Sequence, residues 1–137
     1  MPVVGNELRQ RSAVASGVGA RPPGLEFVIS SRWLANGTFV VAAGGEVDLY
    51  TAPELEQALA GPLAEGTSQL VVDLSEATFV DSTALHVLLR AARQLDPDTG
   101  ELIVVVPDPN VRKVFEITGV GRFFSLVSSL STVSVPS

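Results

Sequence analysis

The sequence feature that most constrains the fold is a junction between a strand and a helix in the middle of the chain. Residues 70–74 form a short apolar run, which is typical of an inner strand covered on both faces of a sheet. From Asp81 onward, apolar residues recur at steps of three and four, as they do along an amphipathic helix. We therefore expect a buried strand, an exposed turn and a helix that begins beside Ser82.

The expected helix separates its residues into two faces. An exposed hydroxyl at Ser82 could carry a phosphate that acts as a switch, because a helix N-terminus offers free N–H groups and partial positive charge. A plainer alternative stays open, in which Asp81 and Ser82 serve only as helix caps worth about 1 kcal/mol each. We expect an inward face of Leu85, Leu88, Leu89, Ala92 and Leu95 and an outward stripe of Ser82, His86, Arg90 and Arg93.

A hairpin is expected near the start of the folded part. Residues 25–34 and 38–43 have the composition of strands, and the Asn36-Gly37 pair between them is a strong signal for a tight turn. The two strands should therefore pair in antiparallel fashion. Residues 44–50 are then expected to form a loop that leads into the first helix.

The other elements are expected to alternate between helix and strand. The first helix should begin at Thr51, because Thr51 and Glu54 have capping-box spacing, and should end near Gly61-Pro62. Gly119 suits the C-terminal cap of the last helix. After the central helix we expect a turn at 96–100, a strand at 101–106, a helix starting at 107–110 with Val111, Val114, Phe115 and Thr118 inward, and a short strand at 123–127.

This order of elements predicts an α/β fold. The expected mixed β-sheet is packed by about three to four α-helices, which act as right-handed crossovers between parallel strands. A length of 137 residues, of which 46% are hydrophobic, suits one domain with one core. We expect a single domain at residues 24–128, a flexible N-terminal tail at 1–23 and a flexible C-terminus at 129–137.

Charge and composition argue against several partners. The formal net charge is −6, and the first 23 residues are basic, so residues 24–137 carry −8. Such acidity would repel nucleic acid and anionic lipid. No apolar run approaches the roughly 18 residues that span a bilayer, and the N-terminus lacks a secretory pattern, so we expect a cytoplasmic protein with no membrane insertion.

Catalytic and metal sites are also not expected. Asp81, Ser82 and His86 are residue types of a serine hydrolase, but Asp81 adjoins the serine instead of lying behind the histidine, and no Gly-x-Ser-x-Gly motif is present. His86 is expected either on a solvated helix face or against a partner. Glu46 and Asp48 are too few to form a metal site, and the chain has no cysteine and one histidine. We therefore expect neither an enzyme nor a cofactor.

Three blocks of sequence resemble one known family. The blocks are Gly45-Glu46-Val47-Asp48, then Val72-Asp73-Leu74-Ser75 with residues 79–85, and then Val106-Pro107 with residues 111–119. In this order, across about residues 25–127, they resemble the STAS domain of bacterial anti-sigma factor antagonists. The resemblance implies a protein that binds an anti-sigma factor serine kinase and so frees a sigma factor. It also implies that the kinase switches the protein off by phosphorylating the serine after the motif aspartate, here Ser82, and that a protein phosphatase resets it.

The resemblance has departures, among them the short, serine-rich C-terminus and the long N-terminal tail, and related functions stay open. The family motif often reads Asp-Ser-Ser-Gly-Leu, whereas this chain has Thr83 and Ala84, so Thr83 becomes a less favoured second phosphoacceptor. Alternatives are a STAS module in a stress-signalling or lipid-transport complex and, less well supported, a serine hydrolase. The expected partner-binding residues are Glu46, Asp48, Thr51, Asp81, Ser82, Thr83, Ala84, His86 and Arg90.

Overall fold

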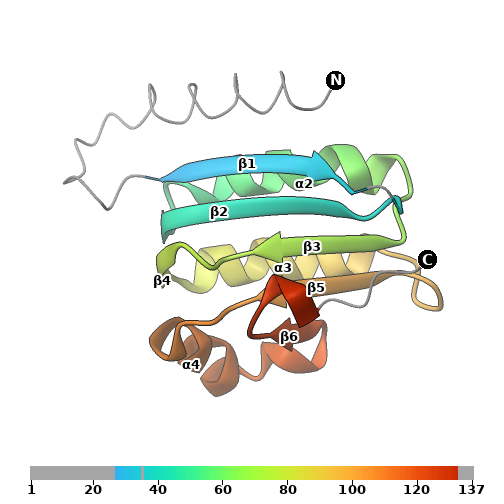
Figure 1. Ribbon diagram of the computed structural model, residues 1–137. Helices are drawn as coiled ribbons and strands as arrows, with labels where there is room; N and C mark the ends of the chain where they lie inside the picture. Colours follow the sequence, from blue (N-terminus) through green and yellow to red (C-terminus); the bar gives the residue numbers. More distant parts are fainter. Residues whose placement is uncertain (1–26, 35, 133–137) are drawn as a thin grey trace.

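Strands and helices alternate along most of the chain, as Figure 1 shows. The computed structural model describes residues 27–34 and 36–132, so the expected N-terminal tail and residues 133–137 lie outside the described part. The strands are β1 (Val28–Trp33), β2 (Phe39–Val47), β3 (Gln69–Asp73), β4 (Ala77–Val80), β5 (Glu101–Val105) and β6 (Ser125–Val127). The helices are α2 (Ala52–Ala64), α3 (Ser82–Gln94) and α4 (Pro109–Thr118), with short 3-10 helices η1 (Val120–Arg122) and η2 (Leu130–Thr132).

The strands form one mixed sheet. Its order is β1-β2-β3-β5-β6, and β4 pairs with the end of β2 beyond the β2–β3 ladder. β1 and β2 are antiparallel, as expected for the hairpin, whereas the β2–β3, β3–β5 and β5–β6 pairs are parallel. The predicted α/β class, mixed sheet and connecting helices are therefore confirmed.

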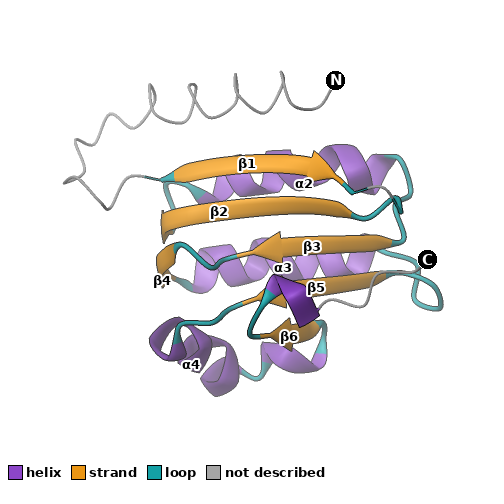
Figure 2. Cartoon of the chain, in the orientation of Figure 1, coloured by secondary structure: helices purple, strands orange, loops and turns teal. Residues whose placement is uncertain are grey.

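The two faces of the sheet are covered differently. α2 and α3 lie side by side on one face, where they bury the larger core (Figure 2). The opposite face has a smaller cluster of Val40, Val71, Ile103 and Val105, against which Leu34, Val127 and Leu130 pack. Leu130 belongs to η2, so part of the expected C-terminal tail contacts the sheet.

Helix α3 follows the predicted division into faces. Asp81 is its N-cap, and Ala84, Leu85, Val87, Leu88 and Ala91 are buried. Leu89 and Ala92 are half-buried against the same core, and Leu95 is buried just after the helix. Ser82, His86, Arg90 and Arg93 are all exposed. The outward stripe that begins at Ser82 is thus confirmed.

Residues 44–50 were wrongly expected to be loop throughout, because β2 continues to Val47. The reason is β4, a strand that we did not predict. Gly45, Glu46 and Val47 pair with Ala77, Phe79 and Val80, with a shift in register between Gly45 and Glu46. This parallel pairing supplies hydrogen bonds to the end of β2, so the chain stays extended until Val47.

The first helix also differs from its expected ends. α2 runs through Gly61-Pro62 to Ala64, with Pro62 buried and Leu63 packed against the core. An internal proline has no backbone N–H, so α2 lacks one backbone hydrogen bond at Pro62 but keeps its apolar packing there. The expected capping box is absent, because the Thr51 hydroxyl bonds within the preceding loop and makes no cap hydrogen bond.

The final helix follows its prediction closely. α4 ends at Gly119, whose φ of 74° lies in the left-handed region that glycine adopts without strain. Val111 and Phe115 are buried and Val114 is half-buried. Thr118 is exposed, contrary to expectation, and its hydroxyl donates to the Val114 carbonyl oxygen of the preceding turn.

The turn before β5 is fixed by the Asp96 carboxylate, which accepts hydrogen bonds from the backbone N–H groups of Asp98 and Thr99. These hydrogen bonds, that from Asp98 first, lower the pKa of Asp96.

The packing of α4 gives a direct test of the fold. Phe115 is fully buried, so Phe115→Ala should lower the free energy of unfolding by about 3–5 kcal/mol. Ile117 is exposed on the same helix, and Ile117→Ala is the matched control, with an expected change within about 0.5 kcal/mol. Urea denaturation of both variants checks this, and equal losses would contradict the packing described here.

Candidate functional site

The candidate site is built around the carboxylate of Asp81, at the end of β4. Asp81 Oδ1 accepts a hydrogen bond from the Ala84 backbone N–H at 3.1 Å, and Oδ2 accepts one from the Leu49 backbone N–H at 3.1 Å. The Asp81 backbone N–H also donates to the Val47 carbonyl oxygen at 3.2 Å. One residue therefore caps α3 and ties the loop after β2 to the start of that helix.

The loop itself is held by short-range hydrogen bonds. Asp48 Oδ1 accepts the Tyr50 backbone N–H at 3.0 Å. The Thr51 hydroxyl donates to the Glu46 carbonyl oxygen at 2.8 Å and accepts the Asp48 backbone N–H at 2.8 Å. Thr51 is buried, so these hydrogen bonds lie on the inner side of the loop and hold its backbone in place. The backbone of the loop is thus fixed at both of its ends.

Most of the expected site residues lie together at this edge of the sheet. The Leu49–Asp81 hydrogen bond brings the predicted loop and the predicted helix start into contact. Ser82 and His86 are exposed, whereas Thr83 is half-buried. Glu46, Asp48 and Asp81 are also half-buried, and Arg90 is exposed and pairs with Glu56 of α2 at 3.0 Å.

Two of the residues that we expected to contact a partner have buried side chains. Thr51 and Ala84 are 8% and 1% exposed, so neither presents its side chain on the surface. Thr51 is turned inward by its hydrogen bond to the Glu46 carbonyl. Ala84 is turned inward because it lies on the core-facing side of α3. Both side chains support the site from beneath.

The position of Asp81 differs from that of the aspartate in a catalytic triad. Its two carboxylate oxygens accept hydrogen bonds from backbone groups of Ala84 and Leu49. A triad needs an aspartate that orients the histidine. Asp81 therefore acts as a structural clasp, by which we mean that its carboxylate joins the loop after β2 to the start of α3. The geometry lends no support to a hydrolase that uses Ser82 and His86.

Sequence reasoning missed the apolar part of the site. Leu49, Tyr50 and Phe79 are 60%, 81% and 49% exposed. Leu49 and Tyr50 are in the loop that Asp81 holds, and Phe79 precedes Asp81 by two residues and pairs with Glu46. The sequence did hold a signal for this apolar part, because Leu49 and Tyr50 are two large apolar residues in the loop that follows the Gly45–Asp48 motif. We call Leu49, Tyr50, Phe79, Asp81 and Ser82 the Ser82 surface.

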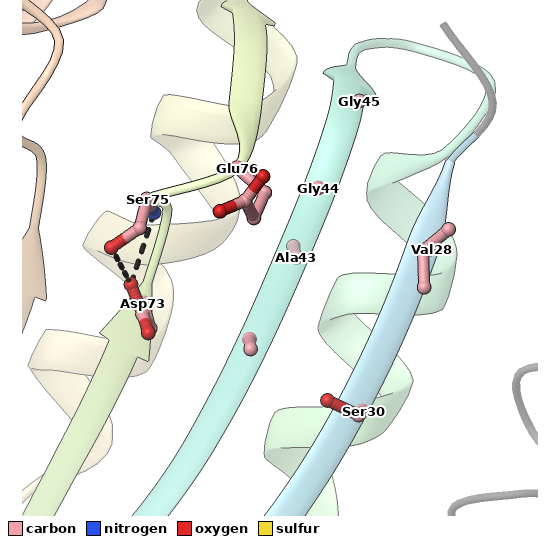
Figure 3. Close-up of a pocket in the computed structure, with 9 residues that line it drawn as sticks. Val28, Ser30, Ala43, Gly44, Gly45, Asp73, Ser75 and Glu76 are labelled. Atoms are coloured by element: carbon pink, nitrogen blue, oxygen red, sulfur yellow. Dashed lines mark hydrogen bonds between the residues drawn. The ribbon is translucent and has the colours of Figure 1, made fainter. Parts of the chain in front are cut away.

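A separate groove lies on the face of the sheet away from the main helices (Figure 3). Its volume is about 410 Å³, and Val28, Ser30, Ala42 and Asp73 line it while their strand neighbours Ile29, Ala43 and Val72 belong to the main core. Gly44 keeps it open, since a Cβ there would lie 3.0 Å from the Glu76 Cβ.

Within residues 27–34 and 36–132, no three potential metal-ligating side chains come together.

Asp81 gives a specific test of the clasp. Asp81→Ala should remove the α3 cap and the Leu49 tether, costing about 1 kcal/mol of stability for the cap and speeding hydrogen exchange of the Leu49 amide by up to about tenfold. Asp108→Ala is the matched control, because Asp108 caps α4 by accepting the Asn110 N–H at 2.8 Å. It should lower stability similarly and leave Leu49 exchange unchanged. Unaltered Leu49 exchange in Asp81→Ala would contradict the tether.

Comparison with known proteins agrees with the fold and with the arrangement of motifs. The STAS domain family model matches residues 34–133. An anti-sigma-B factor antagonist of Staphylococcus aureus is 35% identical over 81 residues, which cover 59% of this chain and 75% of the relative. None of the described helices has the length and apolar character needed to cross a membrane.

Solved structures give the same result. A crystal structure of an anti-sigma factor antagonist from Mycobacterium paratuberculosis is 33% identical, with a TM-score of 0.72 over 80% of this chain and 92% of that one. The Bacillus cell fate determinant SpoIIAA in its phosphorylated form shares the fold, with 21% identity and a TM-score of 0.60 over 76% of this chain and 95% of that one. The chain therefore belongs to the STAS-domain family of anti-sigma factor antagonists.

Proposed function

We propose that this chain is an anti-sigma factor antagonist that binds an anti-sigma factor serine kinase and so releases a sigma factor. Phosphorylation of Ser82 by the kinase switches the antagonist off, and a protein phosphatase restores it. The observation that carries the proposal is the position of Ser82, an exposed hydroxyl at the start of α3, beside a loop that Asp81 holds in place. Relatives named as anti-sigma factor antagonists support the same role.

The start of α3 suits a residue that gains and loses a phosphate. The phosphate adds about −1.5 to −2 charge, and the helix N-terminus offsets roughly 0.3–1 kcal/mol of the repulsion from Asp81. Ser82 is exposed, so the charge is added outside the core and we expect no core side chain to move. The fold should therefore persist, and a phosphorylated form of the shared fold is known for SpoIIAA.

The same charge is costly beneath a partner. Leu49, Tyr50 and Phe79 give the Ser82 surface large apolar side chains, and aromatic residues often dominate the binding energy of interfaces. A kinase packed over them would have to remove water from the phosphate without a matching cation, at a cost of several kcal/mol. Each 1.4 kcal/mol lowers affinity about tenfold, so binding should be lost.

Exposure favours Ser82 over Thr83 as the phosphoacceptor. Ser82 is exposed, whereas Thr83 is half-buried at the first turn of α3. A kinase must bring the hydroxyl oxygen into line with the γ-phosphate of ATP, which requires an accessible side chain. Exposed His86 and Arg90 lie one and two turns further along α3, where they extend the surface available to the partner.

Variants at the phosphoacceptor test the switch. Ser82→Ala should keep kinase binding and lose phosphate incorporation, and Ser82→Asp should weaken binding by about tenfold or more, because a carboxylate adds charge beneath the partner. Thr83→Val is the matched control and should still incorporate phosphate. A pull-down with the purified anti-sigma factor kinase and mass spectrometry after incubation with ATP measure both properties. Equal retention of the kinase by wild type and both Ser82 variants would contradict the switch.

The apolar part of the surface has its own test. Tyr50→Ala should weaken kinase binding by about tenfold or more, because truncating a well-placed aromatic contact often costs more than 1 kcal/mol. Val28 is 44% exposed on β1, where it pairs with Gly44 of β2 and is not one of the residues of the Ser82 surface, so Val28→Ala should bind like wild type. Isothermal titration of the kinase with each variant gives the two affinities. Equal affinities would remove Tyr50 from the interface.

A further inference from the structure

His86 lies one helical turn after Ser82 on α3. Ser82 is the first residue of the helix, and both side chains are exposed on its outward stripe. Residues four apart on a helix have Cβ atoms about 5–6 Å from each other. Each Cα–Cβ bond also tilts toward the amino end of its helix, so a side chain covers the turn before its own. The imidazole of His86 is therefore within reach of a group attached to the Ser82 oxygen.

The ring of His86 has no competing partner in the part of the chain that the structure describes. None of the hydrogen bonds and ion pairs between described residues involves its two nitrogens. The Asp81 carboxylate at the start of α3 is already engaged, because its oxygens accept the backbone N–H groups of Ala84 and Leu49. The His86 ring can therefore bind a newly added anion without breaking an existing contact.

His86 is the group nearest to Ser82 on α3 that can become a cation. Arg90 is one turn further along, and its Nε and Nη2 atoms donate to Glu56 Oε2 of the neighbouring helix α2 at 3.3 and 3.0 Å. Arg93 lies at the far end of α3. The charged residues at the start of α3, within it and on the elements that contact it most, α2 and β5, are Asp81, Arg90, Arg93, Glu54, Glu56 and Glu101.

A phosphate and an imidazole are both charged in mildly acidic solution. An ordinary histidine is protonated below about pH 6.5, and a phosphoserine carries its second negative charge above about pH 6. A protonated imidazole donates from both nitrogens, and a phosphate offers three acceptor oxygens. The attraction between the two groups is therefore strongest at about pH 6–6.5.

We propose that the protonated ring of His86 binds the phosphate of phosphorylated Ser82 and lowers the second pKa of that phosphate. The inference rests on the proposed function, because it concerns a phosphate at Ser82. The phosphorylated chain then keeps the full phosphate charge to a lower pH. Exposed ion pairs are weak, so His86 does not supply the cation that a bound kinase would lack, and binding still switches off.

A phosphorus NMR titration of the full chain tests this contact. Phosphoserine is incorporated at position 82 during protein synthesis, so the test does not need the kinase. His86→Gln removes the ionisable ring, and Arg93→Gln is the matched control, because it removes a cation that lies about 16 Å along α3 from Ser82.

The second pKa of the phosphate should be about 0.3–0.7 pH units lower in the wild-type chain than in His86→Gln. The reason is that a doubly charged phosphate strengthens an ordinary ion pair at this helical spacing about twofold. Arg93→Gln should match the wild type. The difference should shrink at about 1 M salt, where the Debye length falls to about 3 Å.

Two results would overturn the proposal. One is an equal phosphate pKa in the wild type and His86→Gln. The other is an Arg93→Gln variant that raises this pKa as much as His86→Gln does, which would indicate a general effect of charge without a contact. Circular dichroism confirms that each variant is folded. Incubation of the unmodified chain with the kinase and ATP tests the proposed function separately, because either experiment can fail while the other succeeds.

Discussion

The site depends on the two hydrogen bonds that the Asp81 carboxylate accepts. One oxygen caps α3 through Ala84, and the other holds Leu49, which is 32 residues away in the sequence. A single side chain therefore sets the position of Ser82 relative to the apolar loop. Because β4 places Asp81 next to Val47 of β2, the clasp also depends on the pairing of those two strands.

The separation of the site from the core is what would let the proposed phosphorylation of Ser82 act without loss of the fold. The main core is formed by one face of the sheet with the inward sides of α2 and α3, whereas Ser82 is exposed at the end of α3. A charge placed at Ser82 changes the electrostatics at a solvated helix start. Leu85 and Leu88, which hold α3 on the sheet, are buried on the core-facing side of the helix, so we expect their contacts to persist.

Much of the fold was predictable because its signals are local. The Asn36-Gly37 turn predicted the hairpin, the spacing of apolar residues predicted the faces of α3, and Gly119 predicted the end of α4. β4 could not be recognised, because it is four residues long and is held by a parallel partner 32 to 33 residues earlier in the chain. The same pairing extends β2 through residues that otherwise favour a loop.

The candidate site was predictable in part for similar reasons. The motif placed Ser82 at a helix start, and its exposure follows from the polar stripe of α3. The inward turn of Thr51 could not be predicted, since its hydroxyl bonds to the Glu46 carbonyl instead of capping α2. The exposure of Leu49 and Tyr50 could not be predicted either, because their loop is held by a hydrogen bond between Leu49 and Asp81, which are far apart in the sequence.

The most direct measurement of the central claim compares the unmodified chain with a chain phosphorylated stoichiometrically at Ser82. Titration calorimetry gives the affinity of each form for the anti-sigma factor kinase, and urea denaturation gives the stability of each. We predict that phosphorylation weakens binding by more than about tenfold and changes the free energy of unfolding by no more than about 1 kcal/mol. Equal affinities, or a phosphorylated chain that unfolds, would contradict this prediction.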